Sequence, residues 1–334
     1  MDYKYVVFSP YFGKLPDNFN LWLKSCLYNA EIKFIVFTDD NRQWDKPINV
    51  EIIKISFEDF KEKIQKKFDF KISLDTPYKL CDFKPIYGYA FPEYIEGKSY
   101  WGYCDLDIIF GNLLKFLPIN EYDKISYLGH FCLYKNNPKI NSMFKKTPLN
   151  TISYIDILSN PHHFGFDEIC NYGINSIFKN NNLNIFNYEV NVADINCRKT
   201  QMNIIKYENE KFEKENINKI FIFEQGKIYS INYYKNKKKL QEYAYIHLQK
   251  RKMKNFVKNE DEFLIVYNAF IDFEELTHEK FNSYLPVNTI IEKNKIYFLA
   301  RAIKNRFIRF NEIKKILRKK NKNENFNYRI NILP

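Results

Sequence analysis

Residues 100–107 read Tyr-Trp-Gly-Tyr-Cys-Asp-Leu-Asp, so a run of aromatic and apolar side chains ends in two aspartates. The run predicts a buried strand with the two aspartates at its carboxyl end. Side chains two residues apart on a strand point to the same side, so Asp105 and Asp107 can present both carboxylates to one point. Two hard oxygen ligands in this arrangement suit Mg²⁺ or Mn²⁺. The alternative interpretation is a strand-end turn with two solvated aspartates.

Upstream of this strand, strand-like and helix-like segments alternate, which is typical of an α/β layer structure. We expect strands at residues 5–9, 32–37, 50–55 and 99–104, and helices at 16–29, 57–68 and 77–91. In open α/β sheets, ligands gather at the carboxyl ends of strands. Polar clusters stand at three such ends, namely Ser9, residues 38–40 and residues 105–107.

Beyond about residue 125 the pattern is less regular. Residues 221–224 and 227–231 flank Gln225-Gly226 and predict a hairpin, and residues 243–248 predict a further strand. From residue 299, apolar side chains recur at helical intervals, at Leu299, Ile303, Phe307, Phe310, Ile313 and Leu317. Most of the net charge of +12 lies in this segment, which predicts a basic amphipathic helix. We expect it to hold the protein on an anionic inner-membrane surface, and the alternative is a solvated terminal helix.

Composition excludes several classes of protein. A chain of 334 residues that is 45% hydrophobic can bury a sizeable core, so the chain as a whole is not disordered. The six cysteines form no Cys-x-x-Cys pair, which argues against a structural zinc site or a redox dithiol. The sequence shows no signal-peptide pattern and no apolar run of the roughly 20 residues that a membrane span needs, so we expect a cytoplasmic protein. Because the basic excess is confined to the tail, we do not expect nucleic acid as a partner.

Five segments carry a resemblance to a known family. They are residues 10–13 (Pro-Tyr-Phe-Gly), 37–40 (Phe-Thr-Asp-Asp), 78–85 (Tyr-Lys-Leu-Cys-Asp-Phe-Lys-Pro), 101–107 and 247–253 (His-Leu-Gln-Lys-Arg-Lys-Met). In these segments the chain resembles bacterial glycosyltransferases of the GT-A fold, in particular a group found with capsule and surface-polysaccharide genes. The resemblance spans residues 5–255. It implies a GT-A-like, Rossmann-like mixed sheet flanked by helices, with a packed carboxyl-terminal acceptor region.

The same resemblance implies a reaction and its co-substrates. The enzyme would move a sugar from a nucleotide-diphosphate sugar, a UDP-sugar, to a growing or lipid-linked surface glycan. Mn²⁺ or Mg²⁺ would bridge the diphosphate. The chain would then divide into a catalytic domain at residues 1–255, a packed α/β extension at 256–298 and the basic tail at 299–334.

Nucleoside contacts are implied at the first two strand ends. Ser9, Tyr11, Asp39 and Asp40 become candidates for contacts with the ribose and the base, and a uracil ring could stack on Tyr11 or Phe12. The alternative is that Asp39 and Asp40 cap the next turn.

Lys79, Asp82 and Lys84 form a short polar stretch among aromatic residues. On a helix, Lys79 and Asp82 would share a face at spacing three, where Lys79 could meet a phosphate and Asp82 could accept hydrogen bonds from sugar hydroxyls. Lys84 would share this donor site only if Pro85 distorts the helix. A surface salt bridge between Lys79 and Asp82 is the alternative.

His247 ends the strand-like run at residues 243–246, and Lys250 and Arg251 follow it closely. The resemblance implies that His247 is a third metal ligand and that the two cations contact the diphosphate. A packing or surface histidine is the alternative.

The acceptor side is marked less clearly. Asp167 and Glu168 are the candidates for a catalytic base or an acceptor contact, with helix capping by Asp167 as the alternative. Gly129-His130 is a second candidate acceptor site. Two other functions remain open: a metal-dependent nucleotidyl or phosphoglycerol-type transferase, and a non-catalytic glycan-binding protein on a transferase fold.

Overall fold

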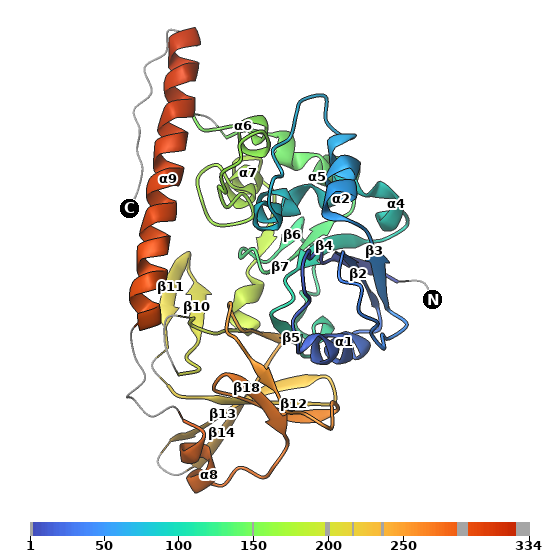
Figure 1. Ribbon diagram of the computed structural model, residues 1–334, viewed down its shortest axis with the longest axis vertical. Helices are drawn as coiled ribbons and strands as arrows, with labels where there is room; N and C mark the ends of the chain where they lie inside the picture. Colours follow the sequence, from blue (N-terminus) through green and yellow to red (C-terminus); the bar gives the residue numbers. More distant parts are fainter. Residues whose placement is uncertain are drawn as a thin grey trace.

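The structure is a computed structural model that describes residues 3–148, 150–197, 201–215, 217–234, 237–285 and 293–324. An α/β body is built from the first two thirds of the chain, an antiparallel sheet lies beside it, and a long carboxyl-terminal helix runs along one side (Figure 1). The α/β fold class expected from the sequence is confirmed. Within the described residues, no helix combines the length and the apolar character needed to cross a membrane.

The largest sheet in the described part of the chain has seven strands in the order β3-β2-β1-β4-β7-β6-β8. Its strands are β1 (Tyr5–Phe8), β2 (Ile32–Thr38), β3 (Val50–Lys54), β4 (Tyr100–Cys104), β6 (Lys124–Ile125), β7 (Phe131–Lys135) and β8 (Ile185–Phe186). Strands β1 to β4 are parallel, and β7 is antiparallel to β4. Strand β1 lies between β2 and β4, so the chain continues from β1 to β2 on one side of β1, and β4 pairs with β1 on its other side. The carboxyl ends of β1 and β4 therefore form a topological switch point, where open sheets bind ligands.

Both faces of this sheet are covered. Alternate residues of β1 point to opposite faces, so Val6 and Phe8 join one core and Tyr5 and Val7 join another. The helices on the two sides are α1 (Phe19–Leu27) and α2 (Phe57–Gln65), with short turns at η1 (Pro77–Ile86), α3 (Tyr87–Ala90) and α4 (Pro92–Ile95). The helix predicted at 77–91 is mostly a 3₁₀-helix. Pro85 lacks the N–H that an α-helical bond there requires, which disfavours regular α-helix.

A three-stranded sheet joins segments that are far apart in sequence. It orders β5 (Ile108–Phe110), β15 (Tyr245–His247) and β9 (Val192–Asp194) as β5-β15-β9. Its register sets His247 opposite Ile108 on one side and opposite Asp194 on the other. This small sheet therefore places His247 opposite Ile108, the residue that directly follows Asp107.

Most of the remaining strands form one sheet, which has six strands among the described residues, in the order β14-β13-β12-β17-β18-β16, and is antiparallel except where β16 pairs with β18. They are β12 (Ile220–Glu224), β13 (Lys227–Tyr234), β14 (Lys237–Tyr243), β16 (Lys254–Asn255), β17 (Glu262–Val266) and β18 (Ala269–Asp272), and a separate hairpin pairs β10 (Ile205–Glu208) with β11 (Lys211–Lys214). The predicted hairpin is confirmed as β12 and β13. The strand predicted at 243–248 is divided between β14 and β15, because the two pair with different sheets. The expected boundary at residue 255 falls within this sheet, since β17 pairs with β12.

Short helices complete the fold: η2 (Leu114–Phe116), α5 (Pro138–Asn141), η3 (Met143–Lys145), α6 (Tyr154–Leu158), α7 (Ile174–Asn180), η4 (Tyr188–Asn191) and α8 (His278–Ser283). The predicted tail helix is α9 (Lys293–Glu324), which begins six residues before the expected position. Its Leu317 is buried against the body, whereas Ile303 and Phe307 are exposed. The Leu299 side chain, residues 286–292 and residues 325–334 lie outside the described part of the chain.

Candidate metal and ligand site

Asp105 and Asp107 stand at the carboxyl end of β4, where several backbone bonds fix the chain. The Asp105 amide donates to the carbonyl of His130 at 2.9 Å. The Leu248 amide donates to the Asp107 carbonyl at 2.8 Å, and the Lys250 amide donates to the Asp107 Oδ2 atom at 2.9 Å. The segment after β15 is thus fastened directly to the second aspartate.

His247 completes a cluster with the two aspartates. Its Nε2 atom lies 3.4 Å from Asp107 Oδ1. One potential ligand atom from each of Asp105, Asp107 and His247 lies within 4.8 Å of the other two. Two carboxylates and an imidazole at this spacing form a donor set that suits Mn²⁺ or Mg²⁺. The three residues predicted as metal ligands therefore lie together.

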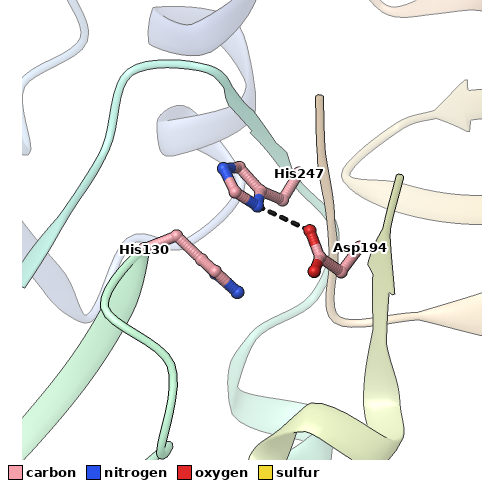
Figure 2. Close-up of side chains that lie close together, drawn as sticks. All are labelled: His130, Asp194 and His247. Atoms are coloured by element: carbon pink, nitrogen blue, oxygen red, sulfur yellow. Dashed lines mark hydrogen bonds and ion pairs between the residues drawn. The ribbon is translucent and has the colours of Figure 1, made fainter. Parts of the chain in front are cut away.

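Asp194 lies behind His247 and was not predicted. Its Oδ1 atom is 2.7 Å from His247 Nδ1, as Figure 2 shows, and also accepts a hydrogen bond from Gln249 Nε2 at 2.7 Å. A carboxylate on Nδ1 fixes the ring and leaves Nε2 directed at Asp107. Burial opposes protonation of His247, but Asp107 and Asp194 outweigh it and raise the pKa of the imidazole well above its usual value. A cation bound at Nε2 would take the place of that proton.

His130 packs against the other side of His247. The two rings stack with centroids 4.2 Å apart, and His130 Nδ1 lies 3.0 Å from the hydroxyl of Tyr245. Burial lowers the pKa of His130 to about 3, so the ring is neutral near pH 7. His130 Nε2 has no hydrogen-bond partner among the described residues. His130 is only 6% exposed, so it packs against His247 rather than presenting itself to an acceptor.

Lys84 links the aspartate pair to the predicted acceptor residues. Its Nζ atom lies 2.7 Å from Asp105 Oδ1 and 3.3 Å from Asp167 Oδ2, and it donates to the Gly129 carbonyl at 2.7 Å. Burial opposes the charge on Lys84, but the two carboxylates outweigh it and raise the pKa of the amine well above its usual value. Asp167 is 2% exposed, and its burial raises the pKa of the carboxyl group, whereas the neighbouring Glu168 is exposed. Of the two predicted acceptor residues, only Glu168 meets solvent.

A cleft of about 540 Å³ opens at the switch point between β1 and β4. Its polar lining includes Tyr11, Lys84, Asp105, Asp107 and Lys250. Aromatic and apolar side chains supply much of the rest, including Phe8, Phe12, Tyr78, Tyr87 and Tyr103. A concave, largely apolar site with a few converging polar groups is the usual form of a small-molecule site.

The two cations after β15 differ in what they can offer a ligand. The Lys250 Nζ atom lies over the ring of Tyr78, 5.6 Å from its centroid, at the lining of the cleft. Arg251 also lines the cleft, but its Nη2 atom donates to the carbonyls of Asn196 and Gln201, at 3.0 and 2.9 Å. Burial lowers the pKa of Arg251. Lys250 is therefore the better placed of the predicted pair to meet a diphosphate.

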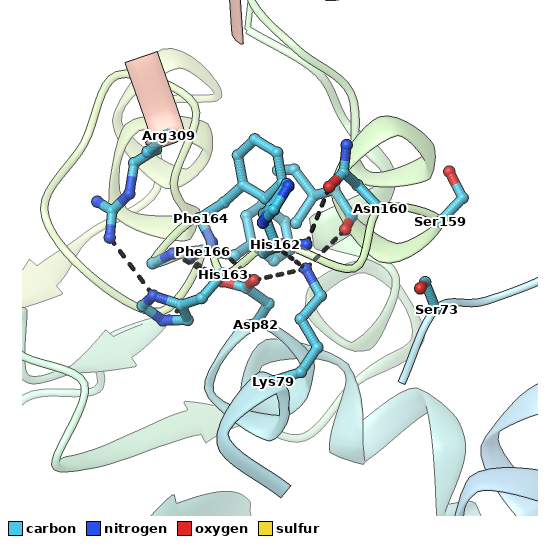
Figure 3. A network of polar contacts seen from close by, with 12 residues as sticks. Ser73, Lys79, Asp82, Ser159, Asn160, His162, His163, Phe164, Phe166 and Arg309 are labelled. Atoms are coloured by element: carbon cyan, nitrogen blue, oxygen red, sulfur yellow. Dashed lines mark hydrogen bonds and ion pairs between the residues drawn. The ribbon is translucent and has the colours of Figure 1, made fainter. Parts of the chain in front are cut away.

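The structure corrects the predicted roles of Lys79 and Asp82. Lys79 is 1% exposed, and its Nζ atom donates to Asp82 Oδ2, Ile157 O and His162 O at 2.8, 2.9 and 2.6 Å. All three N–H bonds of the ammonium are used, so none remains for a phosphate. Asp82 is fully buried and accepts the amides of Phe164, Gly165 and Phe166 at 2.8, 2.7 and 2.9 Å (Figure 3). The pair fixes the loop before Asp167, and its carboxylate does not reach the cleft as a sugar contact would require.

The nucleoside candidates are also largely engaged within the protein. Ser9 is 1% exposed, and its hydroxyl lies 2.9 Å from Cys104 Sγ. Asp39 accepts the Gly13 amide at 2.6 Å, and Asp40 accepts the Leu15 amide at 2.7 Å and pairs with Arg42. The two aspartates hold the loop after β1 against the end of β2. They therefore have a structural role, as in the alternative interpretation that they cap a turn. Tyr11, which is 36% exposed, is the nucleoside candidate in the cleft lining.

The residues missed by the sequence analysis carry only weak signals. Asp194 ends the short strand β9, so it has the same strand-then-aspartate pattern as Asp105. Tyr78 lies inside a segment already singled out, yet its place beside Lys250 depends on the fold. Neither residue could be paired with His247 or Lys250 by spacing in the sequence alone.

Comparisons of this chain with known proteins identify the family to which it belongs. Among solved structures, the glycosyltransferase GlyE of Streptococcus pneumoniae TIGR4 matches with 16% identity and a TM-score of 0.22. That match covers 42% of this chain and 36% of the GlyE chain, so this chain spans about a third of the length of GlyE. No curated protein matches the sequence. A family model described as a family of unknown function (DUF6625) matches residues 7–274. Since this match covers most of the chain, the protein belongs to the DUF6625 family.

Proposed function

We propose that this protein is a metal-dependent glycosyltransferase that moves a sugar from a nucleotide-diphosphate sugar, a UDP-sugar, to a growing surface glycan. The observation that carries the proposal is the cluster of Asp105, Asp107 and His247 beside the cleft. A turn with two solvated aspartates would not need a late histidine fixed against one of them by a buried carboxylate. In this proposal the seven-stranded sheet is the GT-A-like nucleotide-binding core.

The donor set fits a hard divalent cation, with His247 Nε2 oriented by Asp194. Asp105, Asp107 and His247 would hold Mn²⁺ or Mg²⁺, and the ion would supply Lewis-acid stabilisation of the leaving diphosphate. Lys84 already neutralises part of the Asp105 charge, at 2.7 Å. Lys84 thus keeps the carboxylate in place whether or not a second cation approaches.

The cleft lining suggests how the donor is oriented. Lys250 offers an ammonium group at the cleft, and its backbone is fixed by the bond from its amide to Asp107. This places a phosphate-binding cation next to the metal ligands. Tyr11 offers a partly exposed ring at the same cleft, on which a planar base can stack. The lining thus supports binding of a nucleotide diphosphate.

The acceptor side is assigned to the loop that Asp82 fixes. Glu168 is exposed and follows the buried Asp167, whose partner is Lys84. Burial raises the pKa of both carboxyl groups, so their exposure distinguishes them. A base must reach the acceptor hydroxyl, and Asp167, which is 2% exposed, does not meet this condition. We therefore assign the acceptor-side role to Glu168 and a positioning role to Asp167.

A panel of nucleotide sugars, each incubated with Mn²⁺ or with EDTA, tests this function. We expect metal-dependent release of the sugar and of the nucleoside diphosphate from one UDP-sugar, at a rate that falls at least about a hundredfold in D105N/D107N. The exposed aspartates Asp59 and Asp75 provide the control D59N/D75N, which should keep the wild-type rate. Release of a nucleoside monophosphate would instead identify a nucleotidyl-type transferase. Absence of turnover with every donor would contradict the enzyme proposal.

A further inference from the structure

Helix α9 is docked on the body through one side of its carboxyl-terminal half. Leu317 is 7% exposed within the core that contains Trp101 and Phe164, and Ile313 and Ile316 pack against the same core. Polar contacts reinforce the docking. Asn160 Nδ2 lies 3.3 Å from Glu312 Oε2, and Arg309 Nη2 lies 3.4 Å from His163 Nδ1 (Figure 3). The helix is thus a fixed element of the fold.

The side of α9 next to the docked one carries an exposed apolar stripe. Ile303, Phe307 and Phe310 follow one another at spacings of four and three, so they share one side of the helix. They are 59, 66 and 38% exposed. Scattered single apolar side chains on a surface are ordinary, but three on consecutive turns of one helix indicate a contact surface.

Cations surround this stripe. Residues 303–319 contain seven Lys or Arg and one acid, Glu312, which is half-buried and contacts Asn160. A surface groove next to the stripe is lined by Asn311, Lys314, Lys315, Arg318 and Lys319. Lys304 and Arg306 are exposed beside the amino-terminal part of the stripe. Glu312 also lies 3.9 Å from Lys315 Nζ, but the other cations leave a net positive charge. The surface of α9 that carries the stripe, its outward surface, therefore combines large apolar side chains with net positive charge.

We propose that this outward surface of α9 lies on an anionic lipid bilayer, with the apolar stripe in the headgroup region and the cations on lipid phosphates. The apolar stripe and the cations would then both contact the bilayer. An interfacial helix is stabilised by burial of its apolar side chains and by attraction of its cations to anionic lipids. A second copy of the chain would bring two cationic surfaces together, which is unfavourable. Nucleic acid would satisfy the cations but leave the phenyl rings of Phe307 and Phe310 in water. This inference depends on α9 alone and stands apart from the proposed catalytic function.

Point variants test the inference better than deletion of α9, which would also remove Leu317 from the core. Purified full-length protein is mixed with phosphatidylcholine vesicles that contain or lack phosphatidylglycerol, and bound protein is measured by flotation. We expect the protein to bind only the anionic vesicles. Binding should weaken about a hundredfold in R306Q/K314Q/R318Q, at roughly fivefold per charge. Phe307→Ser should weaken it about tenfold.

Two controls make the same kinds of change at exposed positions outside α9. Phe256, which is 60% exposed, provides F256S, and the exposed lysines of β14 provide K237Q/K238Q/K239Q. Both controls should bind vesicles like the wild type, and all variants should melt at the wild-type temperature. The inference is overturned if neutral and anionic vesicles bind equally, or if the α9 variants and the controls behave alike. It is also overturned if Phe307→Ser dissolves a dimer in sedimentation without changing vesicle binding.

Discussion

His247 is the residue on which the candidate site depends. It lies between Asp107, 3.4 Å from Nε2, and Asp194, 2.7 Å from Nδ1. A histidine held in this way has one nitrogen committed to orientation and the other available to a cation. Asp194 therefore supports the assignment of His247 as a candidate metal ligand as much as the two aspartates do.

Replacing Asp194 by Asn tests this orientation. We expect D194N to weaken Mn²⁺ binding by about 10- to 100-fold, because the amide no longer fixes the ring of His247 as a carboxylate does. Mn²⁺ titration followed by electron paramagnetic resonance measures the affinity. Asp261, which pairs with Lys24 at the surface, provides the control D261N. Equal affinity in D194N and D261N would show that Asp194 does not orient the site.

His163 makes stability depend on pH. Burial is the main cause that lowers its pKa from 6.5 to about 4. As the pH falls below 6.5, the unfolded chain takes up this proton first, so stability is complete above pH 6.5 and declines toward pH 4. We expect His163 to contribute a loss of about 2 kcal/mol between pH 7 and pH 5, so H163Q should lose less stability over this range than the wild type by about that amount. Urea unfolding at both values measures it. The exposed His278 provides the control H278Q, which should retain the wild-type slope, and an unchanged slope in H163Q would contradict the assignment.

Several residues of the site could be predicted from the sequence for a physical reason. Asp105, Asp107 and His247 each follow a run that reads as a strand, and strand ends collect ligands in this class of fold. Lys79 and Asp82 were assigned to the ligand because polar residues among aromatics suggest a site. Sequence does not reveal that their partners are backbone groups more than 70 residues away.

At the scale of elements, Asp82 ties η1 to the loop that leads to Asp167. One buried carboxylate accepts three successive amides, at residues 164–166, and also pairs with Lys79. Burial opposes the charge on this carboxylate, but Lys79, supported by the converging amides, outweighs the burial, so the pKa of Asp82 is lowered. The loop conformation therefore depends on a charge supplied by another element.

Replacing Asp82 by Asn should destabilise the protein by about 3 to 5 kcal/mol. The substitution leaves Lys79 as an unpaired buried charge and turns an amide NH₂ toward backbone N–H groups. Chemical denaturation measures the change. Asp75, exposed near the same turn, provides the control D75N, for which we expect a change within about 0.5 kcal/mol. A D82N protein as stable as D75N would contradict this structural role.

The positions of regular strands and helices were predicted better than the points at which the chain leaves one sheet for another. Strands β1 to β4 and helices α1 and α2 have the expected positions, because period-two and helical apolar patterns reflect burial directly. The break between β14 and β15 at Ala244 was not predicted. It arises because Tyr243 pairs with the neighbouring strand β13, whereas Tyr245 pairs with β5, which lies far earlier in the sequence.

At the scale of the whole molecule, the site is assembled by long-range pairing. The sheet β5-β15-β9 brings together residues near 108, 193 and 246, which no local pattern connects. Strand β15 leads directly into residues 248–251, which bond to Asp107 and line the cleft. A single sequence contains no information on such a register. The α/β body could therefore be predicted, but the pairing of β5, β15 and β9 that brings the site residues together could not.

Helix α9 should contribute to stability through one side only. Leu317→Ala removes a buried side chain and is expected to lower the free energy of unfolding by about 2 kcal/mol or more. Phe307→Ala removes an exposed one and should change it by less than about 0.5 kcal/mol. Thermal and urea unfolding compare the two variants. Equal losses would contradict the docking of the carboxyl-terminal half of α9.

The most direct test of the central claim is calorimetric titration of the protein with UDP, in Mn²⁺ and in EDTA. For the wild type, we predict binding that requires Mn²⁺. For Asp107→Asn, which removes the carboxylate shared by His247 and the Lys250 amide, we predict at least about tenfold weaker binding that no longer responds to Mn²⁺. Wild-type binding of equal strength in EDTA, or unchanged Mn²⁺-dependent binding in D107N, would contradict the assignment of Asp105, Asp107 and His247 as a metal and nucleotide-diphosphate site.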